Sequence, residues 1–367
     1  MTLRLLLAPL RGITDWPFRQ AIARHFPGFH EAVAPFINPH KPGGRRLASK
    51  LAPLADLLPE HNQLLPVVPQ LLDNHPESFL AMGKRLEDLG YCRLNWNMGC
   101  PAPMVTRKGR GAAMLAKPDE ICTLLDSVLP RLSCRLSLKM RLGMSNSHEI
   151  LALLPRLNGY PLEELIIHPR LGIQQFKGQP DLDGFAAALA ASAHPVIYNG
   201  DINSLEDFQR LCGRFPQVSG WMIGRGAIAR PALAEEILGN ELSRKPLTEL
   251  PMQPFTEQPV ESPAKLAANA STKSTEFLPR LAAFHDELFA AYAEKLSGPG
   301  HLLGKMKQFW LYFIASFPEQ ERFLKTIVRT HSLARYQEVV RAIFASAANH
   351  ERLLPSLEIQ TSLLNSA

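Results

Sequence analysis

Eight short apolar segments, each followed by a longer segment with helical spacing, are the feature that most restricts how this chain can fold. They recur at intervals of roughly 25 to 43 residues, which leaves room for one helix between consecutive strands. Eight parallel strands with helical connections close into a (β/α)8 barrel, whose functional loops follow the carboxyl ends of the strands. A doubly wound open sheet has the same alternation, so spacing alone leaves both α/β architectures open. The expected strands cover residues 4–8, 31–36, 65–70, 91–97, 134–140, 165–168, 195–199 and 221–224.

The pattern changes after residue 240. Residues 241–275 are rich in Pro, Ser and Thr, which is typical of a linker or surface insertion. Helical spacing then returns, with Leu302, Met306 and Phe309 on one face, and this stripe predicts a helix core more readily than a base-stacking platform. We expect a TIM-barrel catalytic domain over residues 1–240, a linker over 241–275, a small all-α helical bundle over 276–350 and a tail over 351–367.

Composition narrows the class of protein. Hydrophobic residues make up 46% of the 367 residues and charged residues 20%, as in globular proteins with a large core. No apolar run reaches the roughly 18 residues that a membrane span needs, and the first ten residues lack a signal-peptide cleavage pattern. The five cysteines are irregularly spaced without a CxxC pair, which favours a reducing compartment, and no cluster has metal-ligand spacing. We expect a cytoplasmic monomer with no metal site and no membrane segment.

A single thiol lies where the fourth expected strand ends. Residues 97–101 read Asn-Met-Gly-Cys-Pro, and the loop that follows contains Arg107 and Lys108. A thiol placed among cations at a strand end is a candidate proton donor or nucleophile, so Cys100 is the expected catalytic residue.

Five other strand ends also have residues able to bind or react. In a barrel these ends meet at one mouth. Polar residues gather wherever strands stop, because loops are polar, so each position alone is ambiguous, but six strands ending in this way favour a site. The six groups are Gln70, Asn97 with Cys100, Lys139 with Arg141, His168 with Arg170, Asn199 with Asp201, and Gly224 with Arg225.

The last two strand ends predict a phosphate pocket. Residues 224–229 match a G-x-G-x-x-A fingerprint, but the chain then enters the Pro-rich segment instead of another strand, so we reject a dinucleotide fold. Barrels often bind phosphate after strands seven and eight, at backbone N–H groups. Residues 199–201 and Arg225 would therefore hold one phosphate of a mononucleotide, and Lys139 would stabilise negative charge on a flavin ring unless it pairs with a carboxylate at the rim.

A net charge of +6 makes a polyanionic partner plausible, because cations concentrate in two loops around the expected mouth. Solvated charged loops without a partner are the alternative. These cations are Lys41, Arg45, Arg46 and Lys50 after the second strand, and Arg107, Lys108, Arg110 and Lys117 after the fourth.

Taken together, these motifs resemble the tRNA-dihydrouridine synthase family. The likeness spans the first 226 residues, and residues 305–312 are similar to a Lys-Gln-aromatic helix of its C-type subfamily. Arg11, Asn95, Pro169 and Phe176 depart from the family pattern, which leaves the substrate position less well defined than the chemistry. The matching segments are residues 7–15, Gln70, 97–101, 107–109, 111–113, 139–143, His168, Arg170, 199–201 and 224–226.

The resemblance implies an FMN enzyme that uses NADPH to reduce the C5=C6 bond of a uridine in the tRNA D-loop, U16 in the C-type subfamily. Hydride would go from flavin N5 to uracil C6 and a proton from Cys100 to C5, with NADPH and tRNA using the flavin in turn. The implied flavin-binding residues are Pro9, Leu10, Arg11, Gln70, Lys139, His168, Asn199, Gly200, Asp201, Gly224 and Arg225. The implied substrate or tRNA contacts are Asn97, Arg141, Arg170, Arg107, Lys108, Lys305 and Lys307.

Two other functions stay open from the residues alone. One is an FMN barrel oxidoreductase that acts on a free small molecule and needs neither a cationic rim nor a helical tail. The other is a tRNA-binding protein without catalysis, against which the presence of Cys100 and Lys139 argues.

Overall fold

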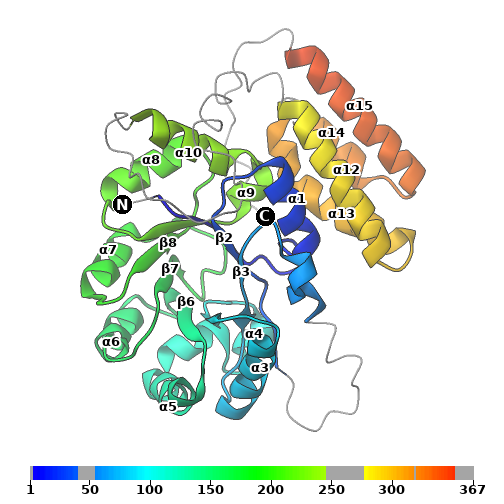
Figure 1. Ribbon diagram of the computed structural model, residues 1–367. Helices are drawn as coiled ribbons and strands as arrows, with labels where there is room; N and C mark the ends of the chain where they lie inside the picture. Colours follow the sequence, from blue (N-terminus) through cyan, green and yellow to red (C-terminus); the bar gives the residue numbers. More distant parts are fainter. Residues whose placement is uncertain (1–2, 40–53, 245–276, 318–319, 352–367) are drawn as a thin grey trace, which may run out of the picture.

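A computed structural model describes residues 3–39, 54–244, 277–317 and 320–351 (Figure 1). The four cations expected after the second strand lie outside these ranges, as do almost all of the expected linker and tail.

The strands form one parallel sheet that closes into a barrel. Its order is β3-β2-β1-β9-β8-β7-β6-β5-β4, and only Pro69 separates the two end strands, so both ends belong to one interrupted strand. Backbone hydrogen bonds flank the break on both sides, from Ala34 N to Val68 O at 3.0 Å and from Asn95 N to Pro69 O at 2.8 Å. The predicted (β/α)8 barrel is therefore confirmed, and the open-sheet alternative is wrong. The strands are β1 (Leu5–Leu7), β2 (Glu31–Val33), β3 (Val67–Val68), β4 (Gln70–Leu71), β5 (Arg93–Met98), β6 (Arg135–Gly143), β7 (Leu165–Leu171), β8 (Val196–Asn199) and β9 (Gly220–Ile223).

All eight expected segments contain strands, but two strands extend three residues further than expected. β6 continues to Gly143 and β7 to Leu171, and they pair with each other along this extension. Arg141 and Arg170 therefore lie within strands and not in loops after them, although the register of the β6–β7 pair shifts between Arg141 and Gly143.

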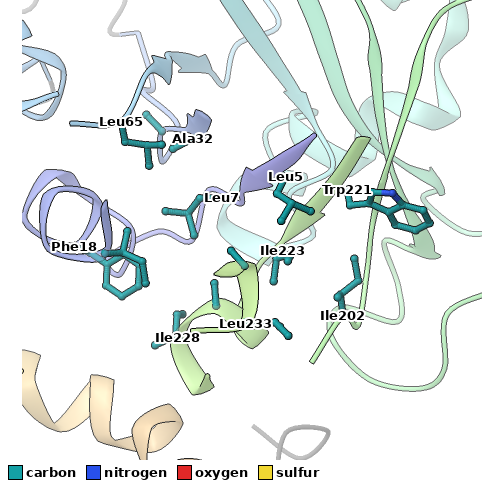
Figure 2. Packing of buried hydrophobic residues seen from close by; sticks show 14 of the residues in the cluster. Leu5, Leu7, Phe18, Ala32, Leu65, Ile202, Trp221, Ile223, Ile228 and Leu233 are labelled. Atoms are coloured by element: carbon teal, nitrogen blue, oxygen red, sulfur yellow. The ribbon is translucent and has the colours of Figure 1, made fainter. Parts of the chain in front are cut away.

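Helices surround the barrel and bury its outer face. In Figure 2, Leu7 of β1 lies on the side of Phe18 from α1, while Leu5 lies near Ile223 and Trp221 of β9, and Ile228 and Leu233 come from the helices that follow β9. The helices of eight or more residues are α1 (Trp16–His25), α3 (Pro76–Asp88), α5 (Pro118–Val128), α6 (His148–Leu157), α7 (Leu182–Ala191), α8 (Leu205–Arg214) and α10 (Leu233–Arg244). The shorter ones are η1 (Ala55–Leu57), η2 (Pro59–His61), α4 (Pro103–Thr106), η3 (Gly111–Ala116), η4 (Leu129–Arg131) and α9 (Arg225–Ala229).

Four α-helices and one 3-10 turn of the described C-terminal part form a bundle beside α1 (Figure 1). The predicted stripe of Leu302, Met306 and Phe309 is buried in its core, which excludes a base-stacking role for these side chains. The division of the chain into separate domains stays a prediction. Within the described ranges, no helix combines the length and apolar character that a bilayer crossing requires. The bundle consists of α12 (Phe277–Lys295), α13 (Pro299–Phe313), η6 (Ile314–Ser316), α14 (Gln320–Val328) and α15 (Leu333–Glu351).

Candidate active site

The loop that contains Cys100 is held from three directions at the carboxyl end of β5. The backbone N–H of Cys100 donates to Oδ1 of Asn97 at 2.9 Å, and its carbonyl accepts from Ala112 N at 3.0 Å. Arg141 Nε of β6 donates to the carbonyl oxygen of Gly99 at 2.9 Å. The position of this residue is thus fixed before any ligand binds.

The surroundings of Cys100 keep its thiol protonated. Burial raises the pKa of Cys100 above its ordinary value, although the Ala102 backbone N–H and the cations Arg141, Arg11 and Lys139 act in the opposite direction. A thiol that keeps its proton at neutral pH is suited to donating one, and less suited to acting as a thiolate nucleophile.

Lys139 presents an ammonium to the mouth, and no group in the described ranges pairs with it. It lies on β6 directly across from Asn97 of β5, and it makes no hydrogen bond or ion pair with any residue in the described ranges. The alternative of a rim lysine paired with a carboxylate is therefore wrong for that part of the chain. Burial, followed by the nearby Arg141 charge, lowers the pKa of Lys139 to about 7. Such an ammonium would be stabilised by an anionic partner.

Asp201, directly after β8, joins two guanidinium groups. Its Oδ1 accepts from Arg170 Nη1 at 2.9 Å and from Arg225 Nη2 at 2.9 Å. Burial alone would raise the pKa of Asp201, but the two arginines outweigh it and the pKa lies below its ordinary value. Asp201 has a φ of 40°, an uncommon conformation for a residue with a side chain, which the ion pairs hold in place.

His168 and Arg170 come from the same strand and contact each other. Arg170 Nη1 lies 3.1 Å from Nε2 of His168, and Arg170 Nη2 donates to the carbonyl oxygen of Gly178 at 2.7 Å. Burial and then the charges of Arg141 and Lys139 bring the pKa of His168 well below its ordinary value. The imidazole is therefore neutral, and its Nε2 accepts from Arg170.

The expected phosphate-binding segments lie side by side. Asn199 Nδ2 donates to the carbonyl oxygen of Met222 at 2.9 Å, which joins the end of β8 to β9. A Cβ atom at Gly226 would lie 2.1 Å from the carbonyl oxygen of Ile202, so only glycine allows this approach. The structure thus brings Gly200 and Asp201 next to Gly224 and Arg225, although their binding of phosphate stays a prediction.

Residues 9–11 follow β1 and lie beside the Gly224 segment, because β1 pairs with β9 and a Cβ atom at Gly224 would lie 4.0 Å from Cδ1 of Leu10. The backbone N–H of Leu10 donates to Oγ1 of Thr14 at 2.8 Å, which orders the loop after β1. The Arg11 guanidinium lies 5.6 Å from the ring centroid of Phe36, and its Nη1 lies 3.4 Å from Sδ of Met104. The Arg11 side chain therefore points toward the loops after β2 and β5, away from Asp201.

The residues expected to contact substrate fall into three groups. Asn97, Arg141 and Arg170 are buried and hydrogen-bonded within the protein, and the Arg141 guanidinium lies 5.4 Å from the ring centroid of Phe176, which is 48% exposed. Arg107 and Lys108 are exposed on the loop after β5.

Lys305 and Lys307 form the third group, and both make internal contacts. Lys305 Nζ donates to Gly12 O at 2.6 Å, and Lys307 Nζ to Thr330 O at 2.6 Å. The prediction that these lysines contact tRNA stays untested.

Sequence reasoning missed Ser137, a buried serine inside β6. Its Oγ accepts from Nδ2 of Asn95 at 2.8 Å, and Gln70 Nε2 donates to Oδ1 of Asn95 at 2.7 Å. A serine between the leucines of β6 has no distinguishing signal in the sequence. Over the part of the chain described by the structure, no group of three His, Cys, Asp or Glu residues is arranged to hold a metal ion.

Comparisons with known proteins identify the family of the chain. The model of the dihydrouridine synthase (Dus) family matches residues 6–262. A probable tRNA-dihydrouridine synthase of Rhodobacter capsulatus is 34% identical over 62% of this chain and 68% of that protein. A tRNA-dihydrouridine(16) synthase of Ralstonia nicotianae is 28% identical over 66% and 74%, and a tRNA-dihydrouridine synthase B of Vibrio cholerae is 29% identical over 64% and 70%.

One solved structure supports the barrel architecture alone. A 2-naphthoyl-CoA reductase is similar with a TM-score of 0.50 at 11% identity, over 65% of this chain and 50% of that one. The family match covers well over half of the sequence and overlaps every strand of the barrel. The chain belongs to the dihydrouridine synthase family and is a flavin-dependent oxidoreductase.

Proposed function

We propose that the chain is an FMN-dependent, NADPH-driven tRNA-dihydrouridine synthase that reduces the C5=C6 bond of a uridine in the tRNA D-loop. One observation carries the proposal: the Cys100 thiol, which burial keeps protonated, shares one barrel mouth with the Lys139 ammonium, which has no partner among the described residues. The names of the related proteins, all tRNA-dihydrouridine synthases, support the substrate class.

The residues present fit a mononucleotide flavin. The Lys139 ammonium lacks an anionic neighbour within the described ranges, and the loop after β8 contacts the start of α9 through Asp201 with Arg225 and Ile202 with Gly226. These two segments would surround one phosphate. FMN, when bound, supplies the hydride for the reduction. Lys139 would stabilise negative charge on the ring, and Asp201 would keep Arg170 and Arg225 in position beside the phosphate.

Cys100 would donate the second hydrogen as a proton. Hydride addition to C6 places negative charge on the uracil ring, and a protonated thiol next to C5 removes that charge. The uridine must first leave its stack, which a tRNA loop permits at lower cost than a duplex. Exposed Arg107 and Lys108 would bind phosphates of the surrounding RNA.

The finer assignments are part of the same proposal. The C-type likeness of residues 305–312 and the Ralstonia relative support position 16 as the modified uridine. We also propose that the chain acts as a cytoplasmic monomer, because its proposed substrate is tRNA and the site described above is formed within one chain.

Mass spectrometry of D-loop fragments tests the proposal. We expect dihydrouridine at position 16 to disappear in cells that lack the gene, to return with the native gene, and to stay absent with Cys100→Ala. Unchanged dihydrouridine at every position would refute the proposed function. A purified flavoprotein that reduces a free enone but not tRNA would favour the small-molecule alternative.

A further inference from the structure

We propose that Asn95 and Ser137 are positioning residues for Cys100, acting through a chain of hydrogen bonds that runs in one direction below the mouth. Neither residue touches the thiol. The inference rests on the proposed function, because it takes Cys100 as the proton donor, and it adds two residues that act through others.

The first hydrogen bonds of this series lead from the catalytic loop to Asn95. The backbone N–H groups of Gly99 and Cys100 donate to Oδ1 of Asn97 at 3.1 and 2.9 Å. Nδ2 of Asn97 donates to Oε1 of Gln70 at 2.8 Å, and Nε2 of Gln70 donates to Oδ1 of Asn95 at 2.7 Å.

The remaining hydrogen bonds of this series lead from Asn95 to the backbone of β5. Nδ2 of Asn95 donates to Oγ of Ser137 at 2.8 Å, and the Ser137 hydroxyl donates to the carbonyl oxygen of Leu94 at 3.2 Å. Gln70 and Asn95 are fully buried, and Ser137 is 1% exposed. Gln70, Asn95 and Ser137 are direct partners across β4, β5 and β6, so the register of the sheet places them in one row.

The backbone at the upper end fixes the direction of every bond. A peptide N–H can only donate, so the amide oxygen of Asn97 must face Gly99 and Cys100, and its nitrogen must face Gln70. The same logic then orients Gln70 and Asn95 in turn, since each amide has one accepting and one donating end. A buried polar chain with every bond made is rigid, whereas one missing partner leaves a buried donor unsatisfied and lets its neighbours rotate.

This series of hydrogen bonds therefore makes the position of the catalytic loop depend on side chains in the interior of the sheet. Asn97 holds the N–H of Cys100 only while Gln70 holds Asn97, and Gln70 is oriented by Asn95 and Ser137. Proton transfer requires the thiol within hydrogen-bond reach of C5, so a small displacement of the loop slows that step more than it affects the flavin.

Three substitutions and one control test this role with tRNA and NADPH as the two substrates of the holoenzyme. Asn95→Leu keeps the side-chain volume but removes the acceptor for Gln70, whereas Asn95→Asp keeps that acceptor and can accept from Ser137. Ser137→Ala removes only the last link. Asn158→Leu is the matched control, because Asn158 makes comparable amide bonds to Ala191 and Ala193, remote from the mouth.

We expect Asn95→Leu to slow reoxidation of the pre-reduced enzyme by tRNA by roughly ten- to a hundredfold, while flavin reduction by NADPH changes by less than about twofold. Asn95→Asp should restore most of the rate, Ser137→Ala should fall between them, and Asn158→Leu should match the native enzyme. A role in packing alone predicts the reverse order, with Leu better tolerated than Asp.

Two results would overturn the inference without touching the proposed function. They are native reoxidation rates in all three variants, or an equal loss in both half-reactions. If instead the native enzyme forms no dihydrouridine from tRNA, the proposed function itself fails, and the inference with it.

Discussion

The ammonium of Lys305 donates a 2.6 Å hydrogen bond to the carbonyl oxygen of Gly12, which joins α13 of the bundle to the loop after β1. The same ammonium lies 3.6 Å from the Asp15 carboxylate and 4.2 Å from the ring centroid of Tyr292. Because Gly12 follows Arg11 directly, the bundle holds a segment that borders the mouth.

Replacing Lys305 with methionine tests whether this contact positions the loop. We expect Lys305→Met to weaken flavin binding, because the loop that contains Pro9, Leu10 and Arg11 loses its anchor. A lysine that only contacted tRNA would leave flavin affinity unchanged. Flavin titration of the apoprotein measures the difference.

Lys307→Met is the matched control for Lys305→Met. Lys307 also donates to backbone carbonyl groups, but these belong to Val328 and Thr330 within the bundle. We expect this variant to lose about 1–3 kcal/mol of stability and to bind flavin normally. Native flavin affinity in Lys305→Met would contradict the positioning role.

Features formed by residues close together in the sequence could be predicted, whereas contacts between residues far apart in the sequence could not. Alternating strands and helices are local patterns, so all eight strands were predictable from the residues. The contact between Lys305 and Gly12 joins residues 293 positions apart, and nothing in the sequence indicates that this lysine is internal. A lysine near aromatic residues predicts a surface cation equally well.

Gly111 controls the backbone of Cys100 through a close contact. Its φ is +60°, and a Cβ atom there would lie 2.5 Å from the carbonyl oxygen of Cys100. We expect Gly111→Ala to displace the catalytic loop and to reduce tRNA reduction by more than about tenfold, in addition to a conformational cost of about 1–3 kcal/mol. Single-turnover reoxidation by tRNA measures the first effect and urea unfolding the second.

Gly109→Ala separates backbone strain from displacement. Gly109 has a similar φ of +64°, but a Cβ atom there would meet only Nδ2 of Asn74, at 3.6 Å. We expect a comparable loss of stability with near-native reoxidation. Equal rates in the two variants would show that the contact with Cys100 is unimportant.

Lys139 makes the stability of the flavin-free protein depend on pH. Its pKa is lowered from 10.5 to about 7, so between these values the unfolded chain binds a proton that the native protein does not. Stability from this group therefore rises with pH above about 7, and below that pH the buried ammonium destabilises the fold. We expect Lys139→Met to stabilise the apoprotein more at pH 6 than at pH 9, as measured by urea unfolding.

Two controls accompany Lys139→Met. Lys84 is an exposed lysine paired with Asp88 on a helix surface, so Lys84→Met should change stability little at either pH. Saturating FMN should reverse the effect, because an anionic partner stabilises the ammonium. A Lys139→Met difference that is the same at pH 6 and pH 9 would refute the lowered pKa.

The candidate site was predictable where chemistry coincides with a strand end. Cys100 and Lys139 were found in this way, and the structure brings both to one mouth. The internal partners of Asn97 and Arg141 were not predictable, because the sequence does not show which hydrogen-bond donors and acceptors become neighbours when the barrel closes. Ser137 was missed for the same reason.

The protonation state of Cys100 gives the most direct test of its role as a proton donor. Burial raises the pKa of this thiol, so less thiolate forms at neutral pH than at an ordinary cysteine, and the thiolate is the species that iodoacetamide alkylates. We expect alkylation at pH 7 to be slower at Cys100 than at the exposed Cys92, and to accelerate at Cys100 as pH rises. Peptide mass spectrometry of the flavin-free protein follows both sites, and Cys92→Ser identifies the signal of each. Faster alkylation of Cys100 than of Cys92 at pH 7 would instead indicate a thiolate and exclude the donor role.

Cys100→Ala tests the donor role in the reaction itself. We expect this variant to slow tRNA reduction by about 10²–10⁴-fold. Flavin reduction by NADPH should stay intact, because the proton is needed only after hydride has been transferred to the uracil ring.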